Sequence, residues 1–251
     1  MHFPDYVSIP DIFPDWENKR DTEDLKDGRK TFPDLIEPDF TNVYENWRST
    51  TLLSTDRAYN LFQVARYVAA NKLPGDFVEC GVLFGGASIM LAIFAECFGL
   101  KDRKHYLFDT FCGSLQPTVE TDYADRKIPF GKWPTFRPVV ERNIARCGID
   151  ASRFVIVEGS VHDTLPAKEL TSLSVVRLDT DDYESTLHEL RTLYPLLVPF
   201  GVLIIDDYGH YKGARRAVDE YFASIDDSPL LQRIDYSGRC AVKVPSPRSS
   251  A

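Results

Sequence analysis

The sequence predicts an α/β protein with a doubly wound, mostly parallel, seven-stranded sheet of the Rossmann-like type. From residue 76 onward, short apolar runs rich in Val and Ile alternate with longer segments of helical period. This alternation is typical of parallel sheets whose helices cover both faces. With 251 residues, the chain is long enough to bury the core of one such domain.

Five apolar runs are expected to form the parallel strands: FVECGV, HYLFDTF, RFVIVEGS, LSVVRLD and GVLIIDDYG. The intervening helices are expected at ASIMLAIFAECF, closed by Gly99, at 136–147, at ESTLHELRTLYPLL and at GARRAVDEYFASI. The long polar segment at 113–135 is expected to be an active-site loop. Two short runs in the tail, LQRIDYS and RCAVKV, would add an antiparallel hairpin and complete seven strands.

The chain before the sheet is expected to fall into two parts. Residues 1–45 are rich in Pro, Asp and aromatic residues and have no evident helical period, so we expect an extended N-terminal arm. Residues 46–75 are expected to form a helical lid, because Ser54 or Thr55 can cap a helix over DRAYNLFQVARYVAANK. The main domain would then comprise residues 76–251.

Charge and cysteine usage argue against several classes of protein. The chain has 38 acidic and 29 basic residues, and a formal net charge of −9 disfavours a nucleic-acid partner. Five cysteines without a CxxC pair favour reduced thiols over a disulfide framework or a zinc cluster. The N-terminus lacks the pattern of a signal peptide, and the longest apolar stretch, 87–95, is too short to span a bilayer. We therefore expect a cytoplasmic protein without a membrane or nucleic-acid partner.

The first candidate binding feature is the turn ECGVLFGG that follows the first apolar run. Ligands of doubly wound sheets bind beyond the carboxyl ends of the strands, where this turn lies. Gly81 would let the backbone turn tightly, and Gly85 and Gly86 would let the helix start approach a ligand closely. The turn lacks the GxGxxG pattern of dinucleotide enzymes. A methionine moiety suits it, because its ammonium group can meet the Gly81 carbonyl; the alternative is a turn without a ligand.

The second candidate is Asp109, which ends the second run about 30 residues after the first glycine of the turn. A carboxylate in this place can accept hydrogen bonds from both ribose hydroxyls of a nucleoside. The alternative is an aspartate that caps the loop. By the same geometry, Gly159 and Ser160 at the end of the third run would border the adenine.

The third candidate is a group of carboxylates at the ends of the fourth and fifth runs: Asp179, Asp206 and Asp207. If the two strands are neighbours, these carboxylates gather at one sheet edge and repel each other. A hard cation resolves the repulsion, and an all-oxygen ligand set favours Mg²⁺, Mn²⁺ or Ca²⁺. The alternative is that they cap the helices that follow.

Asp181 lies two residues after the first of these carboxylates, in LDTDDYEST. A nearby cation would lower the pKa of an acceptor hydroxyl, so a carboxylate of ordinary pKa could serve as the base that removes its proton. A purely structural aspartate is the alternative.

At these residues the sequence resembles the macrocin O-methyltransferase family, which methylates sugars in macrolide and aminocoumarin pathways, and its noviose O-methyltransferase branch in particular. The resemblance covers roughly residues 47–225. It is carried by STDRAYNLFQVARYVAANKLPGDFVECGVLFGGASI, DTFCGSL, VEGSVHDTLP, RLDTDDYEST and LYPLLVPFGVLIIDDYGHYKGARRAVDEYF. It implies the class I methyltransferase fold, S-adenosylmethionine as methyl donor, and a homodimer or larger homo-oligomer.

The resemblance also implies roles for individual residues. It matches Asp179, Asp206 and Asp207 to the metal ligands, with Mg²⁺ or Mn²⁺ as the expected ion, and Asp181 to the general base. The full set that we assign to the cofactor is Glu79, Gly81, Gly85, Ser88, Asp109, Gly159 and Ser160.

The expected function is metal-dependent O-methylation of a small hydroxylated acceptor, a sugar or a glycosylated natural product. A catechol-like phenol is the alternative acceptor. Two other classes stay open at this point: a Rossmann-type oxidoreductase, which would bind a nicotinamide cofactor, and a non-catalytic module that binds S-adenosylmethionine without turnover.

Overall fold

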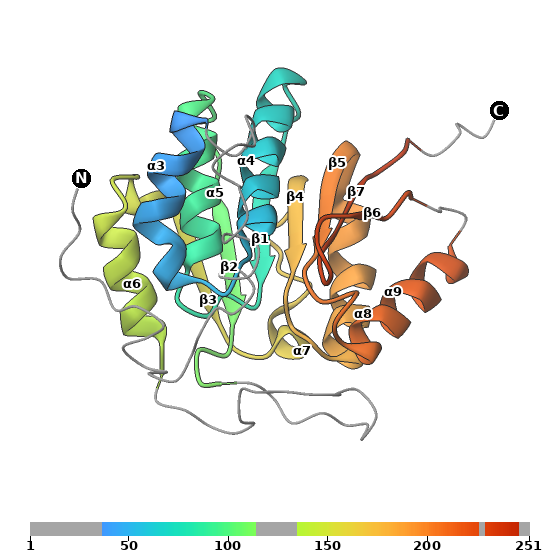
Figure 1. Cartoon of the computed structure of the whole chain (residues 1–251). Helices are drawn as coiled ribbons and strands as arrows, with labels where there is room; N and C mark the ends of the chain where they lie inside the picture. The colour runs from blue at the N-terminus through green and yellow to red at the C-terminus, as the bar shows by residue number, and fades with distance from the viewer. Residues whose placement is uncertain (1–36, 114–134, 226–228, 246–251) are drawn as a thin grey trace.

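β1 (Asp76–Cys80) is an inner strand of a seven-stranded sheet with the order β3-β2-β1-β4-β5-β7-β6 (Figure 1). The computed structural model describes residues 37–113, 135–225 and 229–245. β1 to β5 are parallel, whereas β7 runs antiparallel to β5 and β6 antiparallel to β7. The predicted fold class and the predicted hairpin in the tail are therefore confirmed.

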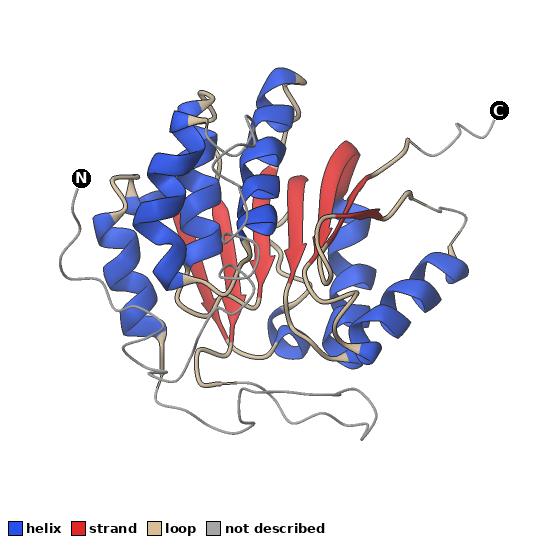
Figure 2. Cartoon of the chain, viewed as in Figure 1, coloured by secondary structure: helices blue, strands red, loops and turns tan. Residues whose placement is uncertain are grey.

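The elements follow the expected alternation of strands and helices (Figure 2). The other strands are β2 (His105–Asp109), β3 (Phe154–Glu158), β4 (Leu173–Leu178), β5 (Leu197–Ile205), β6 (Gln232–Arg233) and β7 (Arg239–Val242). The helices are α3 (Pro38–Trp47), α4 (Thr55–Ala70), α5 (Gly86–Cys97), α6 (Arg137–Arg146), α7 (Val161–Thr164), α8 (Tyr183–Leu193) and α9 (Lys212–Ser224). Most of the predicted loop at 113–135 lies outside the described residues.

The central strands are apolar on both faces, because each face packs against its own layer of helices. Phe77 and Val175 belong to the core cluster that contains α3, α4 and α5. The next residues in each strand, Val78 and Val176, belong to the cluster that contains α8 and α9. Since successive side chains of a strand point to opposite faces, a strand buried on both faces reads as a continuous apolar run. This is the pattern that made the strands recognisable.

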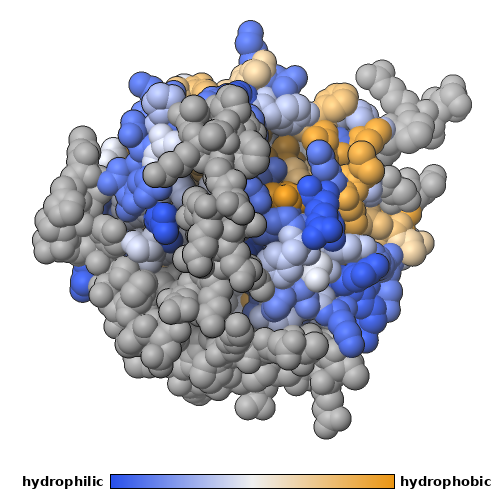
Figure 3. Space-filling view, in the orientation of Figure 1, coloured by the Kyte–Doolittle hydropathy of each residue, from blue (hydrophilic) through white to orange (hydrophobic). Residues whose placement is uncertain are grey.

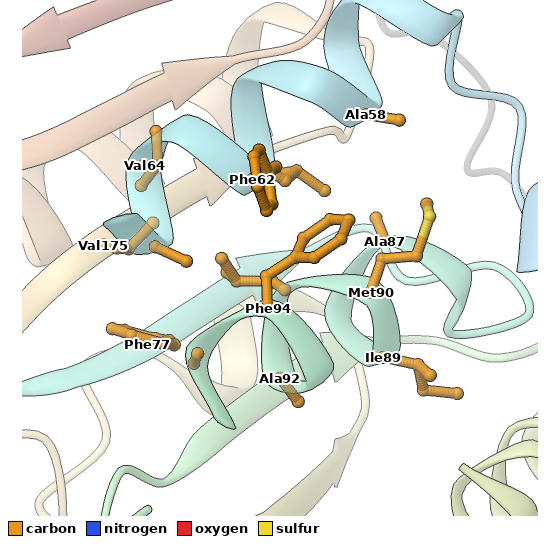
Figure 4. Packing of buried hydrophobic residues seen from close by; sticks show 14 of the residues in the cluster. Ala58, Phe62, Val64, Phe77, Ala87, Ile89, Met90, Ala92, Phe94 and Val175 are labelled. Atoms are coloured by element: carbon orange, nitrogen blue, oxygen red, sulfur yellow. The ribbon is translucent and has the colours of Figure 1, made fainter. Parts of the chain in front are cut away.

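α4 packs into the hydrophobic core through one of its faces. Phe62 of α4 and Phe94 of α5 point toward one another, with ring centroids 5.2 Å apart in an edge-to-face arrangement (Figure 4). Both side chains are fully buried, as are Ala58 and Ala65 on the same side of α4. The predicted helix over 46–75 is therefore present as α4, and it covers one face of the sheet; its role as a lid stays a prediction.

The expected arm over 1–45 is corrected where the structure describes it, because α3 is a helix from Pro38. Proline at the first helical position is favourable, since its missing N–H has no partner there in any helix. Phe40, Tyr44 and Trp47 recur at helical spacing and are buried. The helical period of this segment rests on these three aromatic residues. Residues 1–36 lie outside the described part of the chain.

A patch of exposed apolar side chains lies over the part of the sheet where β5 pairs with β7 (Figure 3). Phe200 is 51% exposed, and Val242 and Val244 are also exposed. The backbone here is paired, since Phe200 N donates to Lys243 O at 2.8 Å. β7 therefore covers the edge of β5 through backbone hydrogen bonds.

None of the helices in the described residues is long and apolar enough to cross a membrane. This agrees with the absence of a long apolar stretch in the sequence. The cytoplasmic location and the homo-oligomer stay predictions.

His105, at the start of β2, gives a testable pH dependence of stability. It is 2% exposed, its ring meets Phe77 edge to face at 4.9 Å, and burial together with Arg153 lowers its pKa to about 3. The unfolded chain therefore binds a proton near pH 6.5 that the folded protein does not bind, so stability falls as the pH falls below about 6.5. For His105→Phe, which keeps the ring contact, we expect the slope of unfolding free energy between about pH 6 and pH 5 to fall by about 1 kcal/mol per pH unit. Denaturant unfolding measures it, and equal slopes in both proteins would contradict it.

Candidate active site

The buried guanidinium of Arg177 joins the ends of three strands. Arg177 lies in β4, opposite Glu79 of β1 in the register, and its side chain is 3% exposed. Its Nη1 donates to Asp179 Oδ2 at 2.8 Å and to Glu79 Oε1, and its Nη2 donates to Asp206 Oδ1 at 2.5 Å. Asp206 follows β5, so one side chain ties together β1, β4 and β5.

Arg177 was not among the predicted site residues, although the sequence carries a signal for it. It is a charged residue within the apolar run LSVVRLD, and it precedes Asp179 by two positions. Because side chains alternate along a strand, that spacing places both residues on the same face. A charge inside a strand that is buried on both faces needs a partner, and the nearest carboxylate of the right face is the first place to look.

Asp206 lies between two arginines. Its Oδ2 accepts a hydrogen bond from Arg57 Nη1 of α4, while its Oδ1 accepts from Arg177. Burial works to raise the pKa of Asp206, but the two guanidinium groups outweigh it and hold the pKa below its ordinary value. Beyond these two bonds, each oxygen keeps a second lone pair. Asp206 is thus fixed and ionised, with partners that the sequence analysis did not anticipate.

The carboxylates that converge most closely are those of Asp179, Asp181 and Asp207. One oxygen of each lies within 4.8 Å of the others. The predicted ligand set contained Asp206 in place of Asp181, so geometry and prediction share Asp179 and Asp207. Asp181 enters the cluster because its backbone takes a positive φ of 70°, a conformation that turns the chain sharply after β4.

The cluster has the electrostatics of a cation site. Burial, together with the charges of Asp181 and Asp179, raises the pKa of Asp207 well above its ordinary value. Burial also raises the pKa of Asp179 by more than Arg177 lowers it. No donor among the described residues hydrogen-bonds the buried Oδ2 of Asp207. Four carboxyl groups pair with the guanidinium groups of Arg57 and Arg177, namely those of Glu79, Asp179, Asp206 and Asp235. With Asp181 and Asp207 beside Asp179, six carboxyl groups stand against two guanidinium groups, which leaves four negative charges uncompensated when all are ionised. Such a surplus suits a divalent cation.

The alternative that these aspartates cap helices does not fit the structure. α8 is capped by Asp182, whose Oδ1 accepts from Ser185 N at 2.8 Å. The residue at the start of α9 is Tyr211, which makes no side-chain capping bond. Asp179 and Asp207 therefore have no capping role at either helix.

The glycine-rich turn after β1 packs directly against the end of β4. Gly81 has a φ of +84°, and a Cβ on it would overlap the backbone carbonyl of Asp179. Gly86, at the start of α5, meets the carbonyl of Thr50 in the same way. Only glycine fits such approaches. The predicted cofactor turn and the carboxylate cluster are therefore in backbone contact.

Asp109 ties this turn to the end of β2. Its Oδ2 accepts from the backbone N–H groups of Val82 at 2.6 Å and Leu83 at 3.0 Å, and its Oδ1 accepts from Phe111 N at 2.8 Å. The next strand is attached to it as well, because Gly159 N donates to Asp109 O at 2.9 Å. The ends of β1, β2 and β3 thus bring Gly81, Asp109 and Gly159 to one edge of the sheet.

Three other residues of the predicted cofactor set are engaged within the protein. Glu79 is buried and accepts from Arg177 at one oxygen and from Ser88 Oγ at the other, and burial raises its pKa to about 7. Ser160 caps α7, its Oγ accepting from His162 N at 3.3 Å. In this structure the side chains of Glu79 and Ser88 hold the turn and Arg177 in place rather than point outward.

The glycine at the start of α5 packs against α6. Gly85 has a φ of +83°, and a Cβ there would lie 3.3 Å from Val140 Cγ1. Its N–H donates to Val82 O at 2.8 Å, which closes the turn. Gly85 therefore shapes the turn that was predicted to approach the cofactor.

Comparison with known proteins identifies the family of this chain. Residues 29–241 match the family described as Macrocin-O-methyltransferase (TylF). The chain is 34% identical over 193 residues to the demethyldecarbamoylnovobiocin O-methyltransferase of Streptomyces niveus, covering 75% of this chain and 73% of that protein. It is 30% identical over 194 residues to the mycinamicin III 3''-O-methyltransferase of Micromonospora griseorubida, covering 75% and 76%.

A solved structure supports the same relationship. The O-methyltransferase NovP superposes with a TM-score of 0.71 and 29% sequence identity, over 93% of this chain and 99% of that one. These similarities set aside the oxidoreductase and the non-catalytic module. The chain belongs to the macrocin O-methyltransferase family and is an S-adenosylmethionine-dependent O-methyltransferase.

Proposed function

We propose that this enzyme transfers the methyl group of S-adenosylmethionine to a hydroxyl of a sugar carried by a natural product, with the help of a divalent cation. The names of its relatives support the acceptor, since one acts on demethyldecarbamoylnovobiocin and another on the 3'' position of mycinamicin III. The observation that carries the proposal is the backbone contact between Gly81 and Asp179. It joins the turn suited to the methyl donor to the carboxylates suited to the acceptor.

In the proposed site Asp179, Asp206 and Asp207 hold the cation, Mg²⁺ or Mn²⁺. The uncompensated carboxylates and the buried Asp207 oxygen without a donor support Asp179 and Asp207 as ligands. Asp206 is assigned from the resemblance to the family. The ion would supply positive charge beside the acceptor and ease loss of the proton from its hydroxyl. Neighbouring hydroxyls on one sugar ring would suit such a site, because they can reach one ion together.

Asp181 is the proposed base. Its carboxylate lies within 4.8 Å of the oxygens of Asp179 and Asp207, close enough to face a hydroxyl held at the cluster. The positive φ that brings it there is a conformation that aspartate adopts more readily than most residues. The turn at Gly81 and the carboxylate of Asp109 would orient the methyl donor on the other side of the acceptor.

Asp207→Asn tests the cation site independently of the stability of the fold. We expect Mn²⁺ binding to be lost and methylation to fall by more than about 100-fold. The metal-free protein should melt at a higher temperature, because the change removes a buried charge that repels its neighbours. Calorimetry, a methylation assay and thermal unfolding measure the three quantities. Unchanged Mn²⁺ affinity would remove Asp207 from the ligand set.

Asp181→Asn tests the base separately from the ligands. We expect kcat to fall by about 10²–10⁴-fold, the range for loss of a general base. Mn²⁺ should still bind, because Asp181 is not a proposed ligand. Asp163→Asn is the control, because Asp163 is exposed and the change also removes one carboxylate. Loss of Mn²⁺ binding in this variant would instead make Asp181 a ligand of the cation.

The function as a whole is tested by removing the ion and varying the acceptor. We expect S-adenosylhomocysteine to bind by calorimetry in both Mg²⁺ and EDTA, while methylation occurs in Mg²⁺ alone. The acceptor panel should contain glycosides with neighbouring hydroxyls, matched deoxy-glycosides with one of the two, and catechols. Transfer only to catechols would overturn the sugar assignment, and full activity in EDTA would overturn the role of the cation.

A further inference from the structure

Asp235 is a buried carboxylate in the turn between β6 and β7, far in sequence from the other site residues. Its side chain is 8% exposed. Its Oδ1 accepts from Ser237 N at 2.8 Å and from Gly238 N at 2.6 Å. These two backbone bonds fix the carboxylate in the turn, so its other oxygen has a defined direction.

That second oxygen reaches the first turn of α4. Asp235 Oδ2 accepts from Ser54 Oγ at 2.8 Å and lies 3.1 Å from Arg57 Nε. Ser54 is also the N-cap of α4, accepting from Arg57 N at 3.2 Å. The contact is close-packed, since a Cβ on Gly238 would lie 3.1 Å from Arg57 Cδ. The hairpin of the tail and the start of α4 are therefore locked together at Arg57.

From Arg57 a continuous path of charged bonds leads to the carboxylate cluster. Arg57 donates to Asp206, Asp206 accepts from Arg177, and Arg177 donates to Asp179. The turn also holds Asp206 directly, because Ser237 Oγ donates to Asp206 O at 2.7 Å. Every member of this path from Arg57 to Arg177 is buried, where an ion pair is screened little by solvent.

We propose that Asp235 is a positioning residue of the cation site: by holding Arg57, it fixes Asp206 and, through Arg177, Asp179. This inference rests on the proposed function, because it assigns Asp235 an effect on the affinity for the cation. The tail hairpin thereby becomes part of the active site without touching a substrate. Outer residues that orient the ligands of a metal commonly alter metal affinity by 10- to 100-fold when they are replaced.

Asp235→Asn is a suitable variant, because it can preserve the hydrogen bonds of Oδ1 while it removes the negative charge that Oδ2 presents to Arg57. The amide oxygen can keep both backbone bonds of Oδ1, and the NH₂ group can donate to Ser54 Oγ, which reverses the direction of that hydrogen bond. Only the ion pair with Arg57 is lost. Arg57→Lys probes the same link from its other end, since an ammonium group keeps the charge but lacks the planar fork that spans two carboxylates. If one variant does not fold, the other carries the test.

The control is Asp102→Asn, which removes one carboxylate that is 85% exposed and pairs only at 3.6 Å with Arg103. Asp102 precedes β2, at the opposite end of the strands from the cluster. All variants are titrated as full-length protein with Mn²⁺, detected by the paramagnetic resonance signal of the unbound ion, and with S-adenosylhomocysteine by calorimetry. Thermal unfolding reports stability in the absence of metal.

For Asp235→Asn and for Arg57→Lys we expect Mn²⁺ affinity to fall by about 10-fold, with S-adenosylhomocysteine affinity and the control unchanged. The double variant should bind Mn²⁺ as tightly as the weaker-binding of the two single variants, because both changes act through Asp206. Equal Mn²⁺ affinity in Asp235→Asn and the parent would overturn the inference and leave the proposed function intact. Parallel losses of both affinities would reduce Asp235 to a structural role. A parent protein that binds no Mn²⁺ would overturn the proposed cation itself.

Discussion

The arrangement of the active site depends on one buried ion-pair network centred on Arg177. A guanidinium that is 3% exposed is stable in a protein only when carboxylates surround it, and Glu79, Asp179 and Asp206 do so from three adjacent strands. Removing Arg177 would leave the buried carboxylates of Glu79 and Asp206 without this partner, and breaking a buried ion pair in this way costs about 3–5 kcal/mol. The ion pairs of Arg177 thus hold the three strand ends in fixed relative positions, and these positions set the geometry of the site.

The same guanidinium couples the two halves of the proposed reaction. On one side, Glu79 connects it through Ser88 to the start of α5, which follows the glycine-rich turn. On the other side, Asp179 belongs to the carboxylate cluster. Gly81 adds a second, steric coupling, because its missing side chain lets the turn lie against the backbone of Asp179. The methyl donor and the acceptor would therefore be positioned by one rigid unit, which is what transfer over a short distance requires.

The sequence predicted the sheet well and the interior of the site incompletely, for physical reasons. A strand buried on both faces must be apolar throughout, so β1 to β5 were visible as runs, and the ends of parallel strands must share an edge. α3 was missed because its period rests on three aromatic residues among polar ones. The partners of Asp206 were missed because they come from α4 and from β4, and Asp235 comes from a hairpin 29 residues later in the chain. Local spacing carries no information about contacts of that kind.

The charge balance explains why such long-range partners are needed. Without Arg57, the carboxylate of Asp206 would lose one of the two guanidinium groups that hold its pKa below the ordinary value, while burial would still act to raise it. A ligand that protonates is lost to the cation. Two arginines keep Asp206 ionised while leaving the cluster itself negative. The protein thus retains a surplus of charge where the cation is to bind, at a cost in stability that the core on both faces of the sheet must offset.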